Sequence, residues 1–185
     1  LLGQVALTQI IANPEDLYPE AVALEGAQAD FRLLLDPFTL DLGQMVIQDR
    51  GQTLHLSGEL VAAEDDWRLS LDGRMDAISP KRVLALWPES LGEKPRKWVA
   101  ENVEKADLTD IVLALRSQPG SKPKVTLNFN FSDATIRFLK TLPPLTGAMG
   151  HGSLMNNRFV AVAEAGKVQA KQGGLIDAAG TAFII

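Results

Sequence analysis

Apolar and polar side chains alternate with a period of two over several stretches of this chain. Between Trp67 and Met75, every second residue is apolar or glycine, and the residues between them are polar or charged. Successive side chains of a β-strand point to opposite faces of the sheet. The alternation therefore predicts strands with one packed face and one solvated face, as in antiparallel sheets.

The same pattern recurs along the chain with different strength. The clearest strand candidates are 53–60, 67–75, 111–115 and 125–131, and weaker ones are 4–11, 22–35, 40–47, 135–139, 159–163 and 175–185. Short turn-like segments separate them, at 49–51, 63–66, 118–121, 156–158 and 164–166. Short connections predict a meander, in which each strand pairs with the next, rather than strands that alternate with long helices.

One segment, at about 79–106, departs from this rhythm. Ser79 followed by Pro80 suits the N-cap and first turn of a helix, and Pro95 suits the start of a second helix. Apolar residues of the second segment recur at helical spacing. We therefore expect a mainly β fold: an antiparallel, curved sheet with a short pair of helices inserted at about 79–106.

Composition limits the classes of partner. The net charge of −5, from 18 Lys and Arg against 23 Asp and Glu, offers no general attraction to nucleic acid, which we do not expect as a partner. The absence of cysteine excludes disulfides and Cys-based zinc sites but leaves both periplasm and cytosol open. Leu1 and Ile185 lie inside apolar patterns, so we expect residues 1–185 to be a single β-rich segment of a longer chain.

Residues suited to catalysis are few. His55 lies in the polar set of an alternating strand, and His151 lies between two glycines, so we expect both imidazoles to be exposed or hydrogen-bonded. The glycine-rich segment 147–152 lacks the Gly-Lys-Ser/Thr of a phosphate loop, and we expect a turn or bulge between strands there.

Acidic residues also match no known site. The pairs Asp65-Asp66 and Asp72/Asp76 lack the spacing of a calcium loop. An envelope hydrolase would need clustered carboxylates, or a nucleophile with its base, and the sequence presents neither arrangement. We therefore expect no enzyme, no catalytic residue, no metal site and no cofactor.

Some stretches carry more apolar residues than one packed face requires, namely 31–35, 40–47 and 139–149. One interpretation is a sheet covered on both faces, by the helices and by neighbouring segments of the parent chain. The other is an open, curved sheet whose concave face stays apolar and holds acyl chains. Periodicity alone leaves both interpretations open.

Two helical segments carry a family resemblance. Residues 76–88, which end in Trp87-Pro88, and residues 94–103, which begin with Lys94-Pro95-Arg96, resemble the periplasmic portion of AsmA-like proteins of the YhdP type. Residues 138–147 are similar to the repeat pattern of the same family. The resemblance covers most of the chain from about Val22 onward.

The resemblance implies a periplasmic segment of a protein anchored in the inner membrane. It implies a long β-groove that conducts phospholipids towards the outer membrane and supports envelope integrity, and it carries no catalytic motif. The implied partners are phospholipid acyl chains and neighbouring segments of the same parent chain. A second copy that pairs through the sheet edges is a further alternative.

A lipid groove would draw one set of apolar side chains from each strand. The candidate lining residues are Leu54, Leu56, Trp67, Leu69, Leu71, Val125, Leu127 and Phe129. The alternation does not tell which face lines a groove and which packs on the helices. The alternative function is a structural or interaction β-module of the envelope without bound lipid, and a cytosolic β-domain without a lipid role also stays open.

Overall fold

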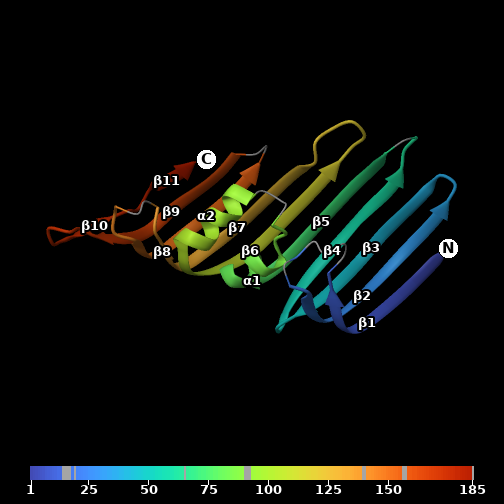
Figure 1. Cartoon of the computed structure of the whole chain (residues 1–185), viewed down its shortest axis with the longest axis horizontal. Helices are drawn as coiled ribbons and strands as arrows, with labels where there is room; N and C mark the ends of the chain where they lie inside the picture. The colour runs from blue at the N-terminus through green and yellow to red at the C-terminus, as the bar shows by residue number, and fades with distance from the viewer. Residues whose placement is uncertain are drawn as a thin grey trace.

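The computed structural model describes residues 1–13, 18, 20–64, 66–89, 93–138, 141–155 and 158–184. These described residues form one sheet and two short helices (Figure 1). The strands are β1 (Leu2–Ala12), β2 (Val22–Leu35), β3 (Phe38–Asp49), β4 (Gln52–Ala62), β5 (Trp67–Ile78), β6 (Val103–Ser117), β7 (Lys124–Ile136), β8 (Leu145–Met155), β9 (Arg158–Gln169), β10 (Leu175–Asp177) and β11 (Thr181–Ile184). Helices α1 (Pro80–Leu86) and α2 (Glu93–Asn102) connect β5 to β6.

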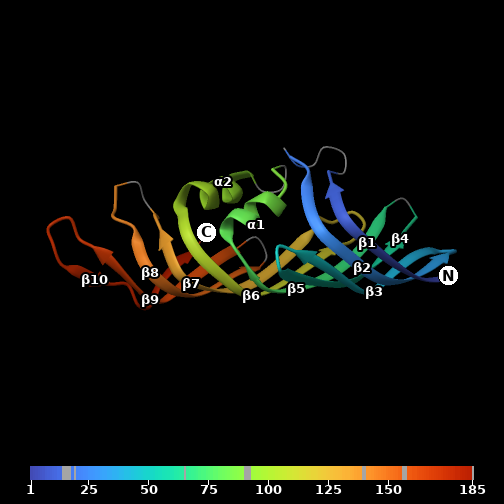
Figure 2. The ribbon, with the colours of Figure 1, turned by 90° about the horizontal axis from the view of Figure 1, so that it is seen from below.

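The sheet is an open antiparallel meander. Strands β1 to β10 follow one another in sequence order, and β11 pairs with β9 beside β10. The expectation of a mainly β, antiparallel meander with a short helical pair is therefore confirmed. Figure 2 shows the sheet bent into a shallow trough, with both helices on its inner side.

Register shifts accompany this curvature. They occur in the β2–β3 and β3–β4 pairs and in each of the pairs from β6–β7 to β8–β9. An extra residue in one strand bends that strand and increases its local twist. The shifts therefore provide local bends along the strands of the trough.

Two segments expected to separate strands lie inside strands. The glycine-rich residues 147–152, where a turn or bulge was expected, belong to β8, and a register shift between Thr146 and Met149 places a bulge-type irregularity there instead of a turn. The expected turn at 164–166 lies inside β9. In both segments small residues pair with neighbouring strands, and large side chains of those neighbours cover them.

The expected helical insertion is too long at its C-terminal end. Helix α2 ends at Asn102, and Val103–Ala106 begin β6, where Ala106 is buried in the core. Thr135 and Ile136 end β7 instead of starting a separate strand, and 175–184 divide into two short strands around Gly180. Asp65, Leu139, Asn156, Asn157 and Ile185, which fall in other expected elements, lie outside the described residues.

One face of the sheet is apolar from edge to edge, and we call it the inner face. Residues that are directly opposite one another in an antiparallel pair share a face. Successive pairs place one row of side chains across strands β1 to β9: Val5, Ala29, Met45, Leu56, Gly73, Leu113, Leu127, Leu154 and Phe159.

The helices pack on this inner face. The Trp98 ring of α2 stacks on Phe183 of β11, with ring centroids 5.1 Å apart, and also contacts Phe138 at 6.4 Å. Phe183 lies opposite Ala161, two residues from Phe159, and therefore belongs to the inner face. Buried residues, most of them alanines, form the core beside these contacts, including Ala106, Ala134, Ala148 and Ala163 with Phe131 and Leu145.

The helices cover only part of the inner face. The accessible surface of the 20.0 kDa chain is 12266 Å². A compact monomer of this mass would expose about 8,700 Å², so this chain exposes roughly 40% more. No large side chain in the described part of the chain is fully buried. A single-layer sheet therefore leaves much of its apolar surface uncovered.

Candidate functional site

The eight candidate lining residues all lie on the inner face. Leu54 and Leu56 come from β4, and Trp67, Leu69 and Leu71 come from β5. Val125, Leu127 and Phe129 come from β7, and they join the others through Leu113 and Leu115 of β6. The pairs Leu71 with Leu115 and Leu115 with Val125 make this connection. The structure therefore brings the whole set onto one continuous surface.

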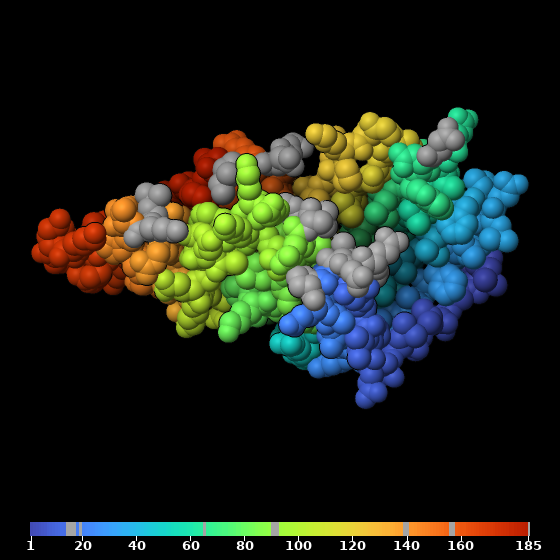
Figure 3. Space-filling view, in the orientation of Figure 1, coloured from blue at the N-terminus to red at the C-terminus, as the bar shows by residue number. Residues whose placement is uncertain are grey.

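This part of the inner face is open to solvent. Trp67 is 48% exposed and Val125 is 44% exposed, and the other six candidates are half-buried. The Phe38 ring meets the Trp67 ring edge to face, with centroids 5.6 Å apart. In the space-filling view the surface over β3 to β5, beside the helices, is recessed (Figure 3). The candidates thus lie on an accessible apolar surface, not in a closed core.

Sequence reasoning missed part of this surface. Leu42 and Met45 of β3 both lie on the inner face, although their spacing does not fit strict alternation. A register shift between them resets the pattern, which explains part of the apolar excess in 40–47. Leu113 and Leu115 had the right periodicity in a recognised strand but were not among the candidates.

Glycines of the inner face give space to large side chains of neighbouring strands. A Cβ on Gly152 would lie 2.3 Å from Cζ of Phe129, because that ring lies across the glycine. A Cβ on Gly73 would lie 2.9 Å from side-chain atoms of both Leu56 and Leu113. Side chains of neighbouring strands therefore occupy the space above these glycines. This arrangement keeps the inner face continuous and apolar without a second layer.

The helical pair forms one boundary of the open surface. Arg96 of α2 donates hydrogen bonds to the carbonyl oxygens of Trp87, at 3.0 Å, and Leu84, at 3.2 Å, and so holds α2 against the end of α1. Ser79 caps α1 by accepting a hydrogen bond from the Arg82 N–H at 3.3 Å. The contacts of Arg96 hold the two helices together as one unit.

The opposite face, which we call the outer face, is polar, and several of its side chains form ion pairs between strands. Arg116 pairs with Asp72 at 2.7 Å, Arg137 pairs with Glu104 at 3.0 Å, and Nδ1 of His151 lies 2.9 Å from Glu164. Arg32 also pairs with Asp41, and Lys105 with Asp133. The hydrogen bond and charge of Asp133 raise the pKa of the exposed Lys105 ammonium.

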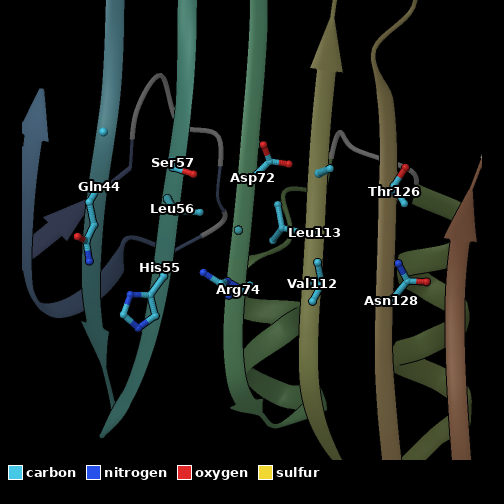
Figure 4. A pocket seen from close by; sticks show the side chains of 13 residues that line it. Gln44, His55, Leu56, Ser57, Asp72, Arg74, Val112, Leu113, Thr126 and Asn128 are labelled. Atoms are coloured by element: carbon cyan, nitrogen blue, oxygen red, sulfur yellow. The ribbon is translucent and has the colours of Figure 1, made fainter. Parts of the chain in front are cut away.

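A hollow of about 570 Å³ lies in the middle of this outer face (Figure 4). His55 lines it and is exposed, as expected from its place in the polar set of β4. Within the described ranges, no group of three or more His, Asp and Glu side chains lies together in a way that could hold a metal ion. Neither α1 nor α2, the helices of the described chain, has the length and apolar composition needed to cross a bilayer.

These features define a class of protein. The chain is a mainly β protein built on one open antiparallel meander, with an apolar inner face partly covered by two helices and a polar outer face. Neither a protein-family model, nor a curated protein, nor a solved structure matches the chain. The geometry and chemistry of its two faces therefore carry the functional argument.

Proposed function

We propose that this chain is a non-catalytic, lipid-handling segment of the AsmA-like, YhdP type, which holds phospholipid acyl chains on its open inner face. The observation that carries the proposal is the uninterrupted apolar row across β1 to β9, together with its incomplete cover. Exposed apolar surfaces of this extent typically mark sites for ligands, membranes or partner proteins.

Acyl chains fit the physical character of this surface. Each methylene group that leaves water for an apolar surface contributes about 0.8 kcal/mol, so a long chain gains affinity without any specific polar contact. The half-buried leucines of β4, β5, β6 and β7 provide such contacts along four consecutive strands. Headgroups would stay in water at the open side of the trough.

The cellular part of the proposal comes from the resemblance of the two helical segments. In this proposal the segment lies in the periplasm, its parent protein is anchored in the inner membrane, and neighbouring segments of that parent continue the groove. Phospholipid would move towards the outer membrane along it, which would support envelope integrity. No covalent step is required for such movement.

Native mass spectrometry with lipid extraction tests the proposal. The protein purified from a bacterial host under mild conditions should carry phospholipid. Leu127→Asp, on the inner face, should abolish the bound lipid, whereas Val112→Asp, which replaces an exposed apolar residue on the outer face, should retain it. Circular dichroism checks that both variants fold. A folded wild type without lipid, or equal lipid in both variants, would contradict the proposal.

A second candidate function is an interaction module that accepts an added strand. The outer edge of β1 has no partner among the described strands, and Leu2–Ala12 contain no charged residue and no proline. Charges and prolines are the usual protection of edge strands, and exposed edges pair readily with other strands. Light scattering with Val5→Lys tests this alternative, since a dimer formed through β1 should dissociate.

A further inference from the structure

Several polar side chains of the outer face form cross-strand pairs, such as Arg116 with Asp72, Asn130 with Asp110 at 2.9 Å, and Thr53 with Gln48 at 3.0 Å. Others on this face have no such partner, and a group of them surrounds the central hollow. Six polar side chains around the hollow form no side-chain hydrogen bond or ion pair with any described residue: Gln44, His55, Ser57, Arg74, Thr126 and Asn128.

The strand register gathers five of these six side chains in two neighbouring rows, and Gln44 of β3 lines the hollow beside them. His55, Arg74, Val112 and Asn128 form one row across β4 to β7, and Ser57, Asp72, Ala114 and Thr126 form the next row. Side chains opposite one another in such rows have Cβ atoms about 4.5–5.5 Å apart. Figure 4 shows the hydrogen-bonding groups around the hollow, with the helices behind the strands.

The hollow favours an anion. No carboxylate lies within ion-pair distance of Arg74 in the described part of the chain, and the carboxylate of Asp72 is already held by Arg116. A guanidinium group that lacks a partner presents a planar set of donors suited to phosphate or carboxylate. The amide and hydroxyl side chains around Arg74 can both donate and accept hydrogen bonds, which suits the hydroxyl groups of a ligand.

The size of the hollow suits a small organic molecule. Its volume of about 570 Å³ lies within the usual range of small-molecule sites, and Gly43, Ser57 and Ala114 leave its floor without bulky side chains. We propose that this hollow binds a small hydroxylated anion of sugar size, such as a sugar phosphate or a uronic acid, with Arg74 on its acidic group. The site is on the face opposite the proposed lipid surface, so each binding activity can be measured without the other.

NMR titration of the full 185-residue protein tests this site. The probes are glucose 6-phosphate, glucuronate and, as the uncharged comparison, glucose. At least one acidic probe should shift the amide signals of His55, Arg74 and Asn128, and glucose should bind far more weakly. Arg74→Gln should lower the affinity for the acidic probe about tenfold or more, because it removes charge-assisted hydrogen bonds.

Arg68→Gln is the matched control. Arg68 lies on the same strand and the same face as Arg74 but outside the hollow, so its replacement removes the same charge without touching the site. The affinity of the Arg68→Gln variant for the acidic probe should stay within about twofold of the wild-type affinity. The proposal is overturned if neither acid shifts these signals, if glucose binds equally well, or if the two arginine variants weaken binding to the same extent.

Discussion

The guanidinium group of Arg82 holds the carboxylate of Asp49 through two hydrogen bonds, from Nε to Oδ2 at 2.6 Å and from Nη2 to Oδ1 at 2.7 Å. The side chains are only 9% and 4% exposed, and Nη2 also donates to the carbonyl oxygen of Ala23 at 2.9 Å. Arg82 lies in α1, Asp49 ends β3, and Ala23 lies near the start of β2. This contact therefore fastens the helical pair to a part of the sheet far away in sequence.

Removal of one partner from this ion pair should be costly. Arg82→Ala leaves the Asp49 carboxylate buried without its counter-ion, and such a loss costs about 3–5 kcal/mol of unfolding free energy. Urea unfolding monitored by circular dichroism measures it. The double variant Arg82→Met with Asp49→Leu should recover most of the loss, since apolar replacements leave no buried charge. If the unfolding free energy of Arg82→Ala lies within about 1 kcal/mol of the wild-type value, water must enter the site and solvate the Asp49 carboxylate.

A side chain at Gly150 should distort the sheet. A Cβ there would lie 1.9 Å from the carbonyl oxygen of Val162, a backbone atom that cannot move aside without breaking the β8–β9 pairing. We expect Gly150→Ala to lower the unfolding free energy by about 2 kcal/mol or more. Gly43→Ala is the control, because its nearest atom, the carbonyl oxygen of Asp30, would be 3.7 Å away. Equal stability of the two variants in urea would refute the close approach.

Tryptophan fluorescence should report where acyl chains lie. Trp67 is 48% exposed on the inner face, whereas the Trp98 ring is stacked on Phe183. Phospholipids with bromine atoms on their acyl chains should therefore quench Trp67 more strongly than Trp98. Variants that keep one tryptophan, with phenylalanine at the other two positions, separate the signals. Equal quenching of both residues would show that the lipid does not prefer the open part of the inner face.

The Lys105–Asp133 pair gives a pH dependence with a defined sign. Asp133, through its hydrogen bond and its charge, raises the pKa of Lys105 above the ordinary value of 10.5. The folded state then holds this proton more tightly than the unfolded state, so the stabilisation is complete below about pH 10.5 and is lost as the pH rises through the raised pKa.

Urea midpoints measured between pH 9 and pH 11.5 test this effect, which should be small because both side chains are exposed. Lys105→Met should remove the part of the fall in urea midpoint with rising pH that this pair causes. Lys122→Met, at a lysine without an ion pair in the described part of the chain, should leave the decline unchanged. The interpretation is wrong if both variants follow the wild type.

Alternation predicted most of this fold because single-layer meanders preserve it along each strand. The alternation failed where an inner-face position is a glycine and a side chain of a neighbouring strand covers it. The glycines of β8 have no apolar side chains of their own, and the rings of Phe129 and Phe131 from β7 cover Gly152 and Gly150 instead. Composition alone therefore suggested a turn or bulge between strands.

The two candidate sites differ in how far the sequence could reveal them. The inner-face candidates follow directly from period-two spacing, so the structure places all eight on one surface. The outer hollow depends on the lateral register of several strands, which brings Gln44, His55, Arg74 and Asn128 together. Turn lengths and bulges set that register, and local patterns do not specify it.

The single-layer sheet also determines how the protein responds to temperature. Folding of this chain removes less surface from water than folding of a compact domain of equal length, because the folded state itself exposes 12266 Å². The heat capacity increment of unfolding should therefore fall below the usual value of about 12–15 cal/mol/K per residue. A smaller increment flattens the curve of free energy against temperature, so the stability of this trough should change little between cold and warm conditions.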